Sequence, residues 1–376
     1  MKTRGAVLTE MGLPAPYAQS RPLEVAELEL APPGPGEMLV KVRAAGLCHS
    51  DLSVIDGSRP RVMPMVLGHE ASGEVVELGP EAHGFEPGDH VSLSFVPTCG
   101  ECAECRGGHA ALCAPGGKAN AAGTLLSGDH RWGERDGGPL HHHLGVSAFA
   151  EHIVVSTHSA VKMPDSLPFE VAALFGCAVL TGVGAVVNAA DVHTGQSVAV
   201  FGLGGVGLAA LLGARLAGAG TLVAIDRMPD KLDLARELGA THTVLAGDDV
   251  VEQVRDATHG LGPDHALETV GSEKVLADAY AATRRGGTTV TVGLPHPDKL
   301  LSIPAVSLVT EERTLKGSYL GSCNPPVDVP RFVDLHLEGR LPVERLLTHR
   351  LSLDELNEGF DRLAAGECVR QAVVFG

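Results

Sequence analysis

Basic residues are scarce in this sequence: 29 lysines and arginines stand against 46 aspartates and glutamates, for a formal net charge of −17 at pH 7. A protein this acidic lacks the positive field that attracts nucleic acid or an anionic membrane surface, so neither is an expected partner. Long apolar runs are also missing. No stretch approaches the ~18 apolar residues of a membrane-spanning helix, and the N-terminal MKTRGAVLTEMGLP has no continuous apolar core of the secretory kind. We therefore expect a cytoplasmic protein that acts on small molecules, alone or with other protein subunits.

A cytoplasmic location would also exclude a disulfide framework for the eight cysteines, because thiols stay reduced there. Clustered thiols in a reducing compartment more often bind a metal or take part in chemistry. The chain has 376 residues, of which 44% are apolar and 20% charged, so it is long enough and apolar enough for two globular domains.

Short alternating segments, punctuated by glycine and proline, occupy the chain from Gly36 to about Val155. They include EMLVKVRAAG, ASGEVVELG, GDHVSLSF and FAEHIVVS. This pattern predicts an irregular, mostly antiparallel β domain. A Gly- and His-rich stretch between Cys113 and Phe149 has too little periodicity for an assignment.

A regular alternation of strands and helices begins after Cys177. The expected strands are SVAVF, TLVAID, THTVLA, DHALETV and TTVTVGL, separated by amphipathic stretches such as DKLDLAREL. Apolar strands between such helices predict a parallel sheet covered on both faces. The helix LDELNEGFDRLAAG and the strand VRQAVVF are expected to return to the first domain. The sequence thus predicts an α/β protein with segments 1–178, 179–320 and 321–376, of which the first and last form one domain.

A glycine-rich turn follows the strand SVAVF and opens an apolar helix. It comprises Gly202, Leu203, Gly204, Gly205, Val206 and Gly207. In this GxGxxG pattern the first glycine permits a tight turn, the second lets the backbone approach a pyrophosphate, and the third lets helix and strand pack closely. The next strand ends in Asp226, whose carboxylate can bind an adenosine ribose and repel a 2′-phosphate. We therefore expect NAD rather than NADP, although the adjacent Arg227 argues the other way and a plain packing turn is the alternative.

Four cysteines are clustered in CGECAECRGGHAALC. They are Cys99, Cys102, Cys105 and Cys113. Four thiolates at this density can surround one tetrahedral ion with no open position, and zinc is the usual occupant of such a closed site. An iron–sulfur cluster or a redox dithiol is the alternative.

A second set of soft ligands is spread along the chain: Cys48 in GLCHSD, His69 in GHE, and Cys177 at the expected domain junction. Two thiolates and one imidazole would give zinc a neutral shell with a fourth, open position and useful Lewis acidity. Spacing alone does not distinguish this set from isolated buried cysteines and a core histidine.

Taken together, these motifs resemble those of the zinc-dependent medium-chain alcohol dehydrogenases. The resemblance rests on GLCHSD, GHE, the four-cysteine cluster, the junction cysteine, GLGGVG and the C-terminal NEGFDRLAAGE…VRQAVVF, and it covers essentially the whole chain. The spacing from Cys113 to Cys177 is similar to that of the long-form members, which include class I and glutathione-linked formaldehyde dehydrogenases. The family implies a GroES-like catalytic domain, a Rossmann coenzyme domain, one catalytic and one structural zinc per subunit, and a homodimer or homotetramer.

The resemblance also implies roles for individual residues. It assigns Cys48, His69 and Cys177 to the catalytic zinc, Ser50 to the alcohol proton, and Asp51 to the orientation of the zinc histidine. Glu70 is implied to lie beside the metal, with an ordinary ion pair as the alternative. The residues implied to contact the coenzyme, besides the glycine loop and Asp226, are His49, Lys231, Val292, Gly293, Leu294 and Arg370.

Two features depart from the family pattern. Many relatives end their proton relay in a histidine five residues after the catalytic cysteine, whereas this chain has Ser53, which cannot hold a proton as a base near neutral pH. We therefore expect alcohol oxidation to depend steeply on pH and to favour alkaline conditions. Positions that are commonly apolar in the substrate cleft fall on Arg59, Lys118 and His143, while Phe95, Leu144, Leu294 and Leu320 keep an apolar wall. These residues suggest a substrate with a polar or anionic tail, with ordinary surface-loop charges as the alternative.

The leading interpretation is an NAD- and zinc-dependent alcohol dehydrogenase that interconverts a primary or secondary alcohol with an aldehyde or ketone. A formaldehyde dehydrogenase acting on a thiol adduct is the near alternative. A zinc-stabilised nucleotide-binding protein without turnover is a third reading, because folds outlive functions. A zinc-free quinone reductase would have no need of the four-cysteine cluster.

Overall fold

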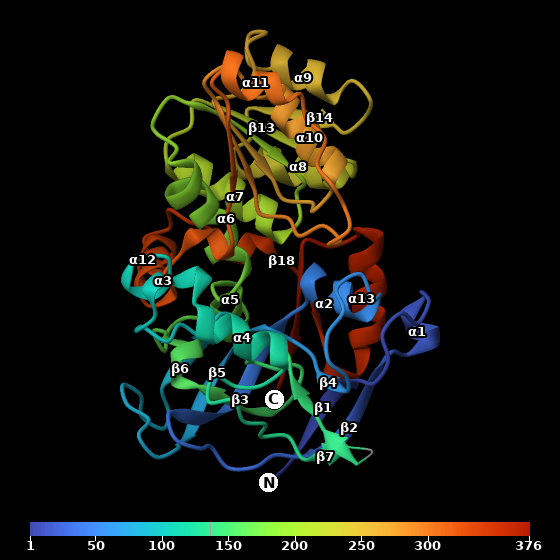
Figure 1. Ribbon diagram of the computed structural model, residues 1–376, viewed down its shortest axis with the longest axis vertical. Coiled ribbons are helices and arrows are strands. Elements are labelled where there is room, and N and C mark those ends of the chain that lie inside the picture. The colour runs from blue at the N-terminus through green and yellow to red at the C-terminus, as the bar shows by residue number, and fades with distance from the viewer. Residues whose placement is uncertain (136) are drawn as a thin grey trace. The chain divides into compact units, whose positions relative to one another are not determined.

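The computed structural model describes residues 1–135 and 137–376, which cluster into two units (Figure 1). The first unit comprises Met1–Cys177, Asn324–Arg331 and Leu347–Gly376, and the second comprises Ala178–Cys323 and Phe332–Leu346. Among the described residues, no helix combines the length and the apolar character needed to cross a membrane.

Mostly antiparallel strands form the first unit. Its larger sheet has the order β11-β6-β5-β3-β19-β18 with β10 also paired to β3, its smaller sheet has the order β2-β1-β4-β9, and β7 pairs with β8. The strands are β1 Lys2–Leu8, β2 Leu23–Glu29, β3 Glu37–Gly46, β4 Met65–Val66, β5 Glu70–Leu78, β6 His90–Leu93, β7 Glu134–Arg135, β8 Gly138–Pro139, β9 His141–His142, β10 His152–Ser156, β11 Ala160–Lys162, β18 Leu347–Leu351 and β19 Arg370–Val374. The helices are α1 Tyr17–Ser20, α2 His49–Ile55, α3 Ala103–Arg106, η1 Ala110–Leu112, α4 Ala114–Ala122, η2 Thr157–Ser159, α5 Phe169–Leu174, η6 Leu353–Glu355 and α13 Leu356–Ala365.

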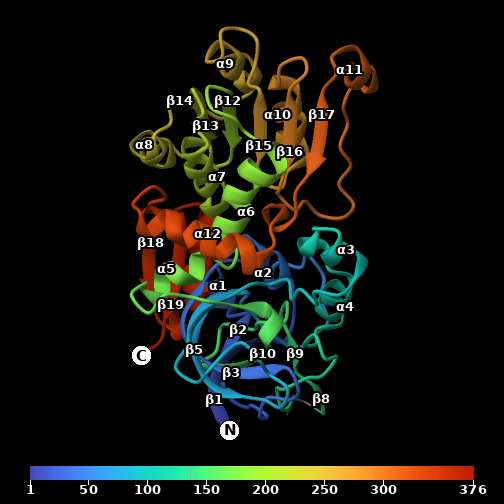
Figure 2. The same cartoon turned by 90° about the vertical axis from the view of Figure 1, so that its left-hand side faces the viewer.

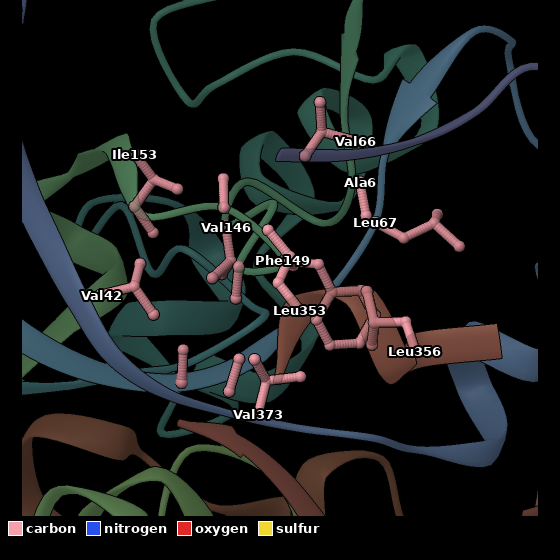
Figure 3. Close-up of a cluster of buried hydrophobic side chains, with 14 of the residues drawn as sticks. Ala6, Val42, Val66, Leu67, Val146, Phe149, Ile153, Leu353, Leu356 and Val373 are labelled. Carbon is pink, nitrogen blue, oxygen red and sulfur yellow. The ribbon is translucent and has the colours of Figure 1, made fainter. Parts of the chain in front are cut away.

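The core of the first unit lies between its sheets and helix α13. Figure 3 shows side chains from β1, β3, β4, β19 and α13 lying together with Phe149, so segments from both ends of the chain share one core. Phe149 is fully buried and its ring meets that of Phe360 edge to face at 6.0 Å. The C-terminal segment is therefore part of this unit's hydrophobic core.

A parallel sheet with the order β14-β13-β12-β15-β16-β17 forms the second unit (Figure 2). Its strands are β12 Ser197–Phe201, β13 Thr221–Asp226, β14 His242–Leu245, β15 His265–Glu268, β16 Thr288–Thr291 and β17 Thr314–Gly317. Its helices are α6 Ala178–Gly184, the π-helix η3 Ala185–Ala190, α7 Gly205–Leu216, α8 Pro229–Leu238, α9 Val250–Asp256, α10 Glu273–Ala282, α11 Ala305–Thr310, η4 Leu320–Ser322 and η5 Val343–Leu346. Strand β12 is almost entirely buried, as expected of a parallel strand covered on both faces. The predicted α/β fold class, a β-rich domain together with a parallel sheet covered by helices, is confirmed.

The C-terminal part of the chain does not follow the predicted boundaries throughout. Residues 321–323 and 332–346 belong to the second unit, whereas the sequence assigned all of 321–376 to the first domain. Helix α12, Pro325–Leu337, begins in the first unit and ends in the second. The physical reason is apolar burial: Val343 and Leu346 in η5 are fully buried, and η5 packs against α7 of the second unit.

Candidate metal and coenzyme sites

Pairing of strands β3 and β5 brings the first two predicted zinc ligands together. Gly46, at the end of β3, lies opposite Glu70, at the start of β5, so the residues that flank this pair, Cys48 and His69, become neighbours. A Cβ atom on Gly46 would lie 2.3 Å from the Glu70 carboxylate, so only glycine allows this close approach. Cys177 completes the set, which we call the three-ligand site.

The ligand atoms of Cys48, His69 and Cys177 all lie within 4.8 Å of one another. Cys177 Sγ is 3.5 Å from His69 Nε2, and all three side chains are buried. Two sulfurs and one imidazole nitrogen converging in this way fit a tetrahedral zinc ion that keeps a fourth position for another ligand.

Asp51 fixes the orientation of two of these ligands. Its Oδ1 lies 3.0 Å from His69 Nδ1 and accepts a hydrogen bond from Gly68 N at 3.2 Å, while its Oδ2 accepts from Cys48 N at 3.2 Å. The carboxylate is fully buried in the first turn of α2, which Cys48 caps. Because Nδ1 faces a carboxylate, Nε2 is left to face the sulfur of Cys177.

The two thiols of the three-ligand site shift each other's pKa in opposite directions. A hydrogen bond from Cys177 holds the pKa of Cys48 well below its usual value, and the same hydrogen bond raises the pKa of Cys177 well above it. Burial lowers the pKa of His69, but the Asp51 carboxylate outweighs burial and the net pKa is well above the usual value. Zinc binds thiolate and neutral imidazole, so a zinc ion bound at this site would displace the protons that the raised pKa values retain on Cys177 and His69.

A buried acid–base pair adjoins the three-ligand site. Arg370 Nη2 lies 3.6 Å from Glu70 Oε2, and Arg370 Nη1 donates to Leu47 O at 3.0 Å. Burial raises the pKa of Glu70 to about 7, although the Arg370 guanidinium opposes that rise. The coenzyme contact implied for Arg370 stays a prediction, because here the guanidinium meets Glu70 and Leu47.

The predicted relay residues lie on the first turns of α2. His49 is exposed, Ser50 is half-buried, and the half-buried Ser53 donates its hydroxyl proton to His49 O at 2.7 Å. This intrahelical hydrogen bond occupies the Ser53 hydroxyl. The Ser53 hydroxyl therefore cannot take the place of a histidine as a proton acceptor at that position.

The residues predicted for the substrate cleft differ in their surroundings. His143 is 1% exposed, and its Nδ1 lies 3.2 Å from Asp51 Oδ1 without the alignment of a hydrogen bond. Phe95 packs edge-on against His69, with 5.5 Å between the ring centroids. Lys118 is exposed on α4 and Arg59 is partly buried. Leu144 and Leu320 are buried, whereas Leu294 is 45% exposed. His143 is thus a neighbour of the Asp51 carboxylate, which its place in the sequence did not reveal.

The four-cysteine site is formed by the chain around α3 and η1. The sulfurs of Cys99, Cys102, Cys105 and Cys113 all lie within 4.8 Å of one another. Backbone N–H groups of Cys99 and Cys102 donate to the sulfurs of Cys113 and Cys99 at 3.3 and 3.4 Å. Burial and the neighbouring thiol of Cys102 raise the pKa of Cys105 to about 12, while backbone N–H groups outweigh burial and lower the pKa of Cys99 to about 7. Four crowded thiols cannot all ionise without a cation, so this donor set fits a closed zinc site.

The glycine loop connects β12 to α7 in the second unit. Gly202 has a φ of +95°, and a Cβ atom on Gly207 would lie 1.8 Å from Gly202 O, so both positions require glycine. A Cβ atom on Gly204 would meet no protein atom within 4 Å. Space at the backbone of the second glycine is what a bound pyrophosphate needs.

Asp226, at the end of β13, contacts the glycine loop through its carboxylate. Its Oδ2 accepts from Leu203 N at 2.7 Å and its Oδ1 accepts from Met228 N at 2.9 Å. The carboxylate is partly exposed, so it retains acceptor capacity for a ribose. Lys231 is partly buried on α8.

The segment Val292 to Leu294 follows β16 at the same carboxyl edge of the sheet as the glycine loop. Val292 and Gly293 are partly buried. The sequence did not single out Glu268, a fully enclosed carboxylate at the end of the intervening strand β15. A carboxylate at the carboxyl end of an apolar parallel strand, as in DHALETV, was the available signal.

Comparisons with known proteins identify the family of this chain. Residues 34–165 match the alcohol dehydrogenase GroES-like domain, and residues 205–338 match the zinc-binding dehydrogenase family. The chain is 36% identical to S-(hydroxymethyl)glutathione dehydrogenase of Paracoccus denitrificans over 100% of both proteins. It is 39% identical to an NDMA-dependent alcohol dehydrogenase of Amycolatopsis methanolica over 100% of this chain and 99% of that protein. An alcohol dehydrogenase zinc-binding domain protein of Burkholderia ambifaria has a similar structure, with a TM-score of 0.92, 36% identity, and coverage of 100% of this chain and 99% of the other.

Proposed function

Because this chain belongs to the zinc-dependent medium-chain alcohol dehydrogenase family, we propose that it catalyses the reversible, NAD-linked oxidation of a primary or secondary alcohol to an aldehyde or ketone. The observation that carries the proposal is the convergence of two sulfurs and one imidazole nitrogen in the three-ligand site. Such a set leaves a zinc ion one coordination position for a substrate oxygen.

Cys48, His69 and Cys177 would hold a zinc ion, which would supply Lewis acidity toward a bound hydroxyl group. The glycine loop would hold NAD, which would supply the hydride acceptor. The residues of this chain would supply the remaining functions.

Asp51 orients His69 and holds Cys48 through its backbone N–H. Ser50, two residues after Cys48, would receive the proton of the alcohol. Beside the three-ligand site, Arg370 offsets the buried charge of Glu70. In this proposal Asp51 positions the metal ligands, Ser50 carries a proton, and the ion pair of Arg370 and Glu70 adjusts the electrostatic field at the site.

The test is metal content per subunit, measured together with NADH formation on a broad panel of alcohols. We expect about two zinc ions per subunit and alcohol-dependent NADH formation that is lost on chelation and restored by zinc. Parallel assays with NADP would test the choice of coenzyme made from Asp226, against which Arg227 argues. A protein that binds NADH but turns over no alcohol or aldehyde would instead be a nucleotide-binding member without catalysis.

A thiol adduct of formaldehyde is a second candidate substrate, and the relative from Paracoccus denitrificans is named for such a substrate. The adduct is itself a primary alcohol, so the same three-ligand site could act on it. Formaldehyde oxidation that requires glutathione or another thiol would favour this candidate. Equal rates with and without thiol would exclude it.

We also propose that two copies of the chain associate through the β17 edge of the second unit. Strand β17 lies at one end of the six-stranded sheet, and the nearby α11 leaves Val306 and Val309 66% and 79% exposed. An open strand edge beside exposed apolar side chains favours pairing with another copy. Light scattering of the wild-type protein and of Val309→Glu would test this, because a dimer through this surface should dissociate in the variant.

A further inference from the structure

One short segment contacts both parts of the predicted coenzyme site. It is the ETVG segment, Glu268 to Gly271, which follows β15 at the carboxyl edge of the parallel sheet. Strand β15 lies between β12, which leads into the glycine loop, and β16, which leads into Val292. The segment therefore lies between the glycine loop and the Val292–Leu294 segment.

On the side of the glycine loop, Thr269 makes the contacts. Its backbone N donates to Phe201 O at 3.0 Å, and its hydroxyl donates to Gly202 O at 2.9 Å. A Cβ atom on Gly207 would lie 2.8 Å from the Thr269 hydroxyl oxygen. The first and last glycines of the loop are thus both in close contact with this threonine.

On the other side, Glu268 makes the contacts. Its Oε2 accepts from Thr291 Oγ1 at 2.7 Å, and its backbone O accepts from Val292 N at 2.9 Å. A Cβ atom on Gly293 would lie 2.1 Å from Gly271 N and 2.9 Å from Glu268 Oε2. The Val292–Leu294 segment therefore rests directly on the ETVG segment.

The Glu268 carboxylate also holds the ETVG segment itself in shape. Its Oε1 accepts from Val270 N at 2.7 Å and from Gly271 N at 2.6 Å. The side chain is 1% exposed, and no lysine or arginine in the described part of the chain forms an ion pair with it. A buried carboxylate satisfied by neutral donors alone is costly to keep, which suggests a function for it.

We propose that Glu268 is a positioning residue for the coenzyme. Its carboxylate holds the ETVG segment in the one conformation that keeps the glycine loop and the Val292–Leu294 segment at a fixed separation, so that the two halves of a dinucleotide bind together. The proposal rests on the proposed function, because it requires that a nicotinamide dinucleotide binds at this edge.

The test compares two probes on the zinc-loaded protein: NADH, titrated by its fluorescence, and ADP-ribose, measured by competition. ADP-ribose lacks the nicotinamide and should depend mainly on the glycine loop. In Glu268→Gln the amide NH₂ replaces one acceptor oxygen, so we expect Kd for NADH to rise about tenfold and Kd for ADP-ribose to rise less than about threefold. Thr291→Val removes one hydrogen bond while keeping the carboxylate, and should produce the same selective loss at about threefold. If Glu268→Gln does not fold, this milder variant decides.

Asp264→Asn is the matched control. Asp264 precedes the same strand at its opposite end and accepts from Ser197 N at 2.7 Å and from Ser197 Oγ at 2.6 Å. It should lower thermal stability without changing either Kd. Unchanged NADH binding in both test variants, or equal weakening of NADH and ADP-ribose, would overturn the role of Glu268. A wild-type protein that binds neither probe would instead overturn the proposed function.

Discussion

Replacing Asp51 by asparagine should loosen the zinc in the three-ligand site while leaving the four-cysteine site intact. The Asp51 carboxylate makes three contacts that an amide cannot reproduce together: His69 Nδ1 and Gly68 N on Oδ1, and Cys48 N on Oδ2. If the amide oxygen of asparagine keeps the first two, its NH₂ group faces the N–H of Cys48, and two donors oppose each other.

One hydrogen bond to a charged group contributes about 1.5–3 kcal/mol. That range agrees with the 10–100-fold loss of metal affinity typical for residues that orient a metal ligand, which corresponds to about 1.4–2.7 kcal/mol. We therefore expect Asp51→Asn to release the zinc of the three-ligand site 10–100-fold faster to a chromogenic chelator, with alcohol oxidation declining at the same rate.

The four-cysteine site serves as the internal reference, because it would hold a second zinc in the same molecule. A further control is Asp89→Asn, which removes a partly exposed carboxylate that is ion-paired with Lys162. That variant should release both metals at the wild-type rate. Release from both sites at the wild-type rate in Asp51→Asn would refute the orienting role, and equal acceleration at both sites would mean that the whole unit is destabilised.

Three further predictions follow from individual side chains. Cys105→Ser should lower the zinc content by about one ion per subunit and lower the melting temperature, with NADH affinity unchanged at 25 °C, as metal analysis and titration would show. Ser53→His should move the pH profile of alcohol oxidation toward neutral pH, because an imidazole holds a proton there and the present hydroxyl is bonded to His49 O; an unchanged profile would contradict this. Burial lowers the pKa of His142 to about 3. As pH falls below about 6.5, this histidine is protonated in the unfolded state but stays neutral in the folded state, so the free energy of unfolding falls. Between pH 7.5 and 5.0 the wild-type free energy of unfolding should therefore fall by about 2 kcal/mol more than that of His142→Gln, measured by urea denaturation, and equal falls would count against the buried neutral histidine.

The second unit was the more predictable half of the molecule. Strands such as SVAVF and TLVAID are short, apolar and bounded by amphipathic helices, so local pattern and tertiary environment agree, and β12 and β13 cover those residues. The GxGxxG turn could be placed because its first and last glycines meet local steric requirements: Gly202 has a positive φ, and Gly207 lies against the Gly202 carbonyl. Where the backbone conformation is determined by residues adjacent in the chain, a single sequence is enough to predict it.

The secondary structure between Cys113 and Phe149 could not be predicted from the sequence, because it depends on contacts with residues distant in the chain. It contains α4 and the two-residue strands β7, β8 and β9, which are too short to produce a periodic signal. The three consecutive histidines at its end have different neighbours: His141 lies 3.1 Å from His130, His142 accepts from Arg131 N, and His143 faces Asp51. No sequence pattern indicates such divergence.

The buried pair of Glu70 and Arg370 shows what motif reasoning could not supply. Each residue was identified singly from the resemblance, one for the metal and one for the coenzyme, yet they lie 3.6 Å apart beside the three-ligand site. They meet because β19 pairs with β3, which in turn pairs with β5, so the last strand of the chain is placed against the first part of the fold. Removing Arg370 alone would leave a buried carboxylate without its cation, a cost of several kcal/mol that proteins usually avoid by protonation. The C-terminal strand therefore contributes to the electrostatics of the metal site as well as to the core. That contribution can be recognised only once the strand order is known.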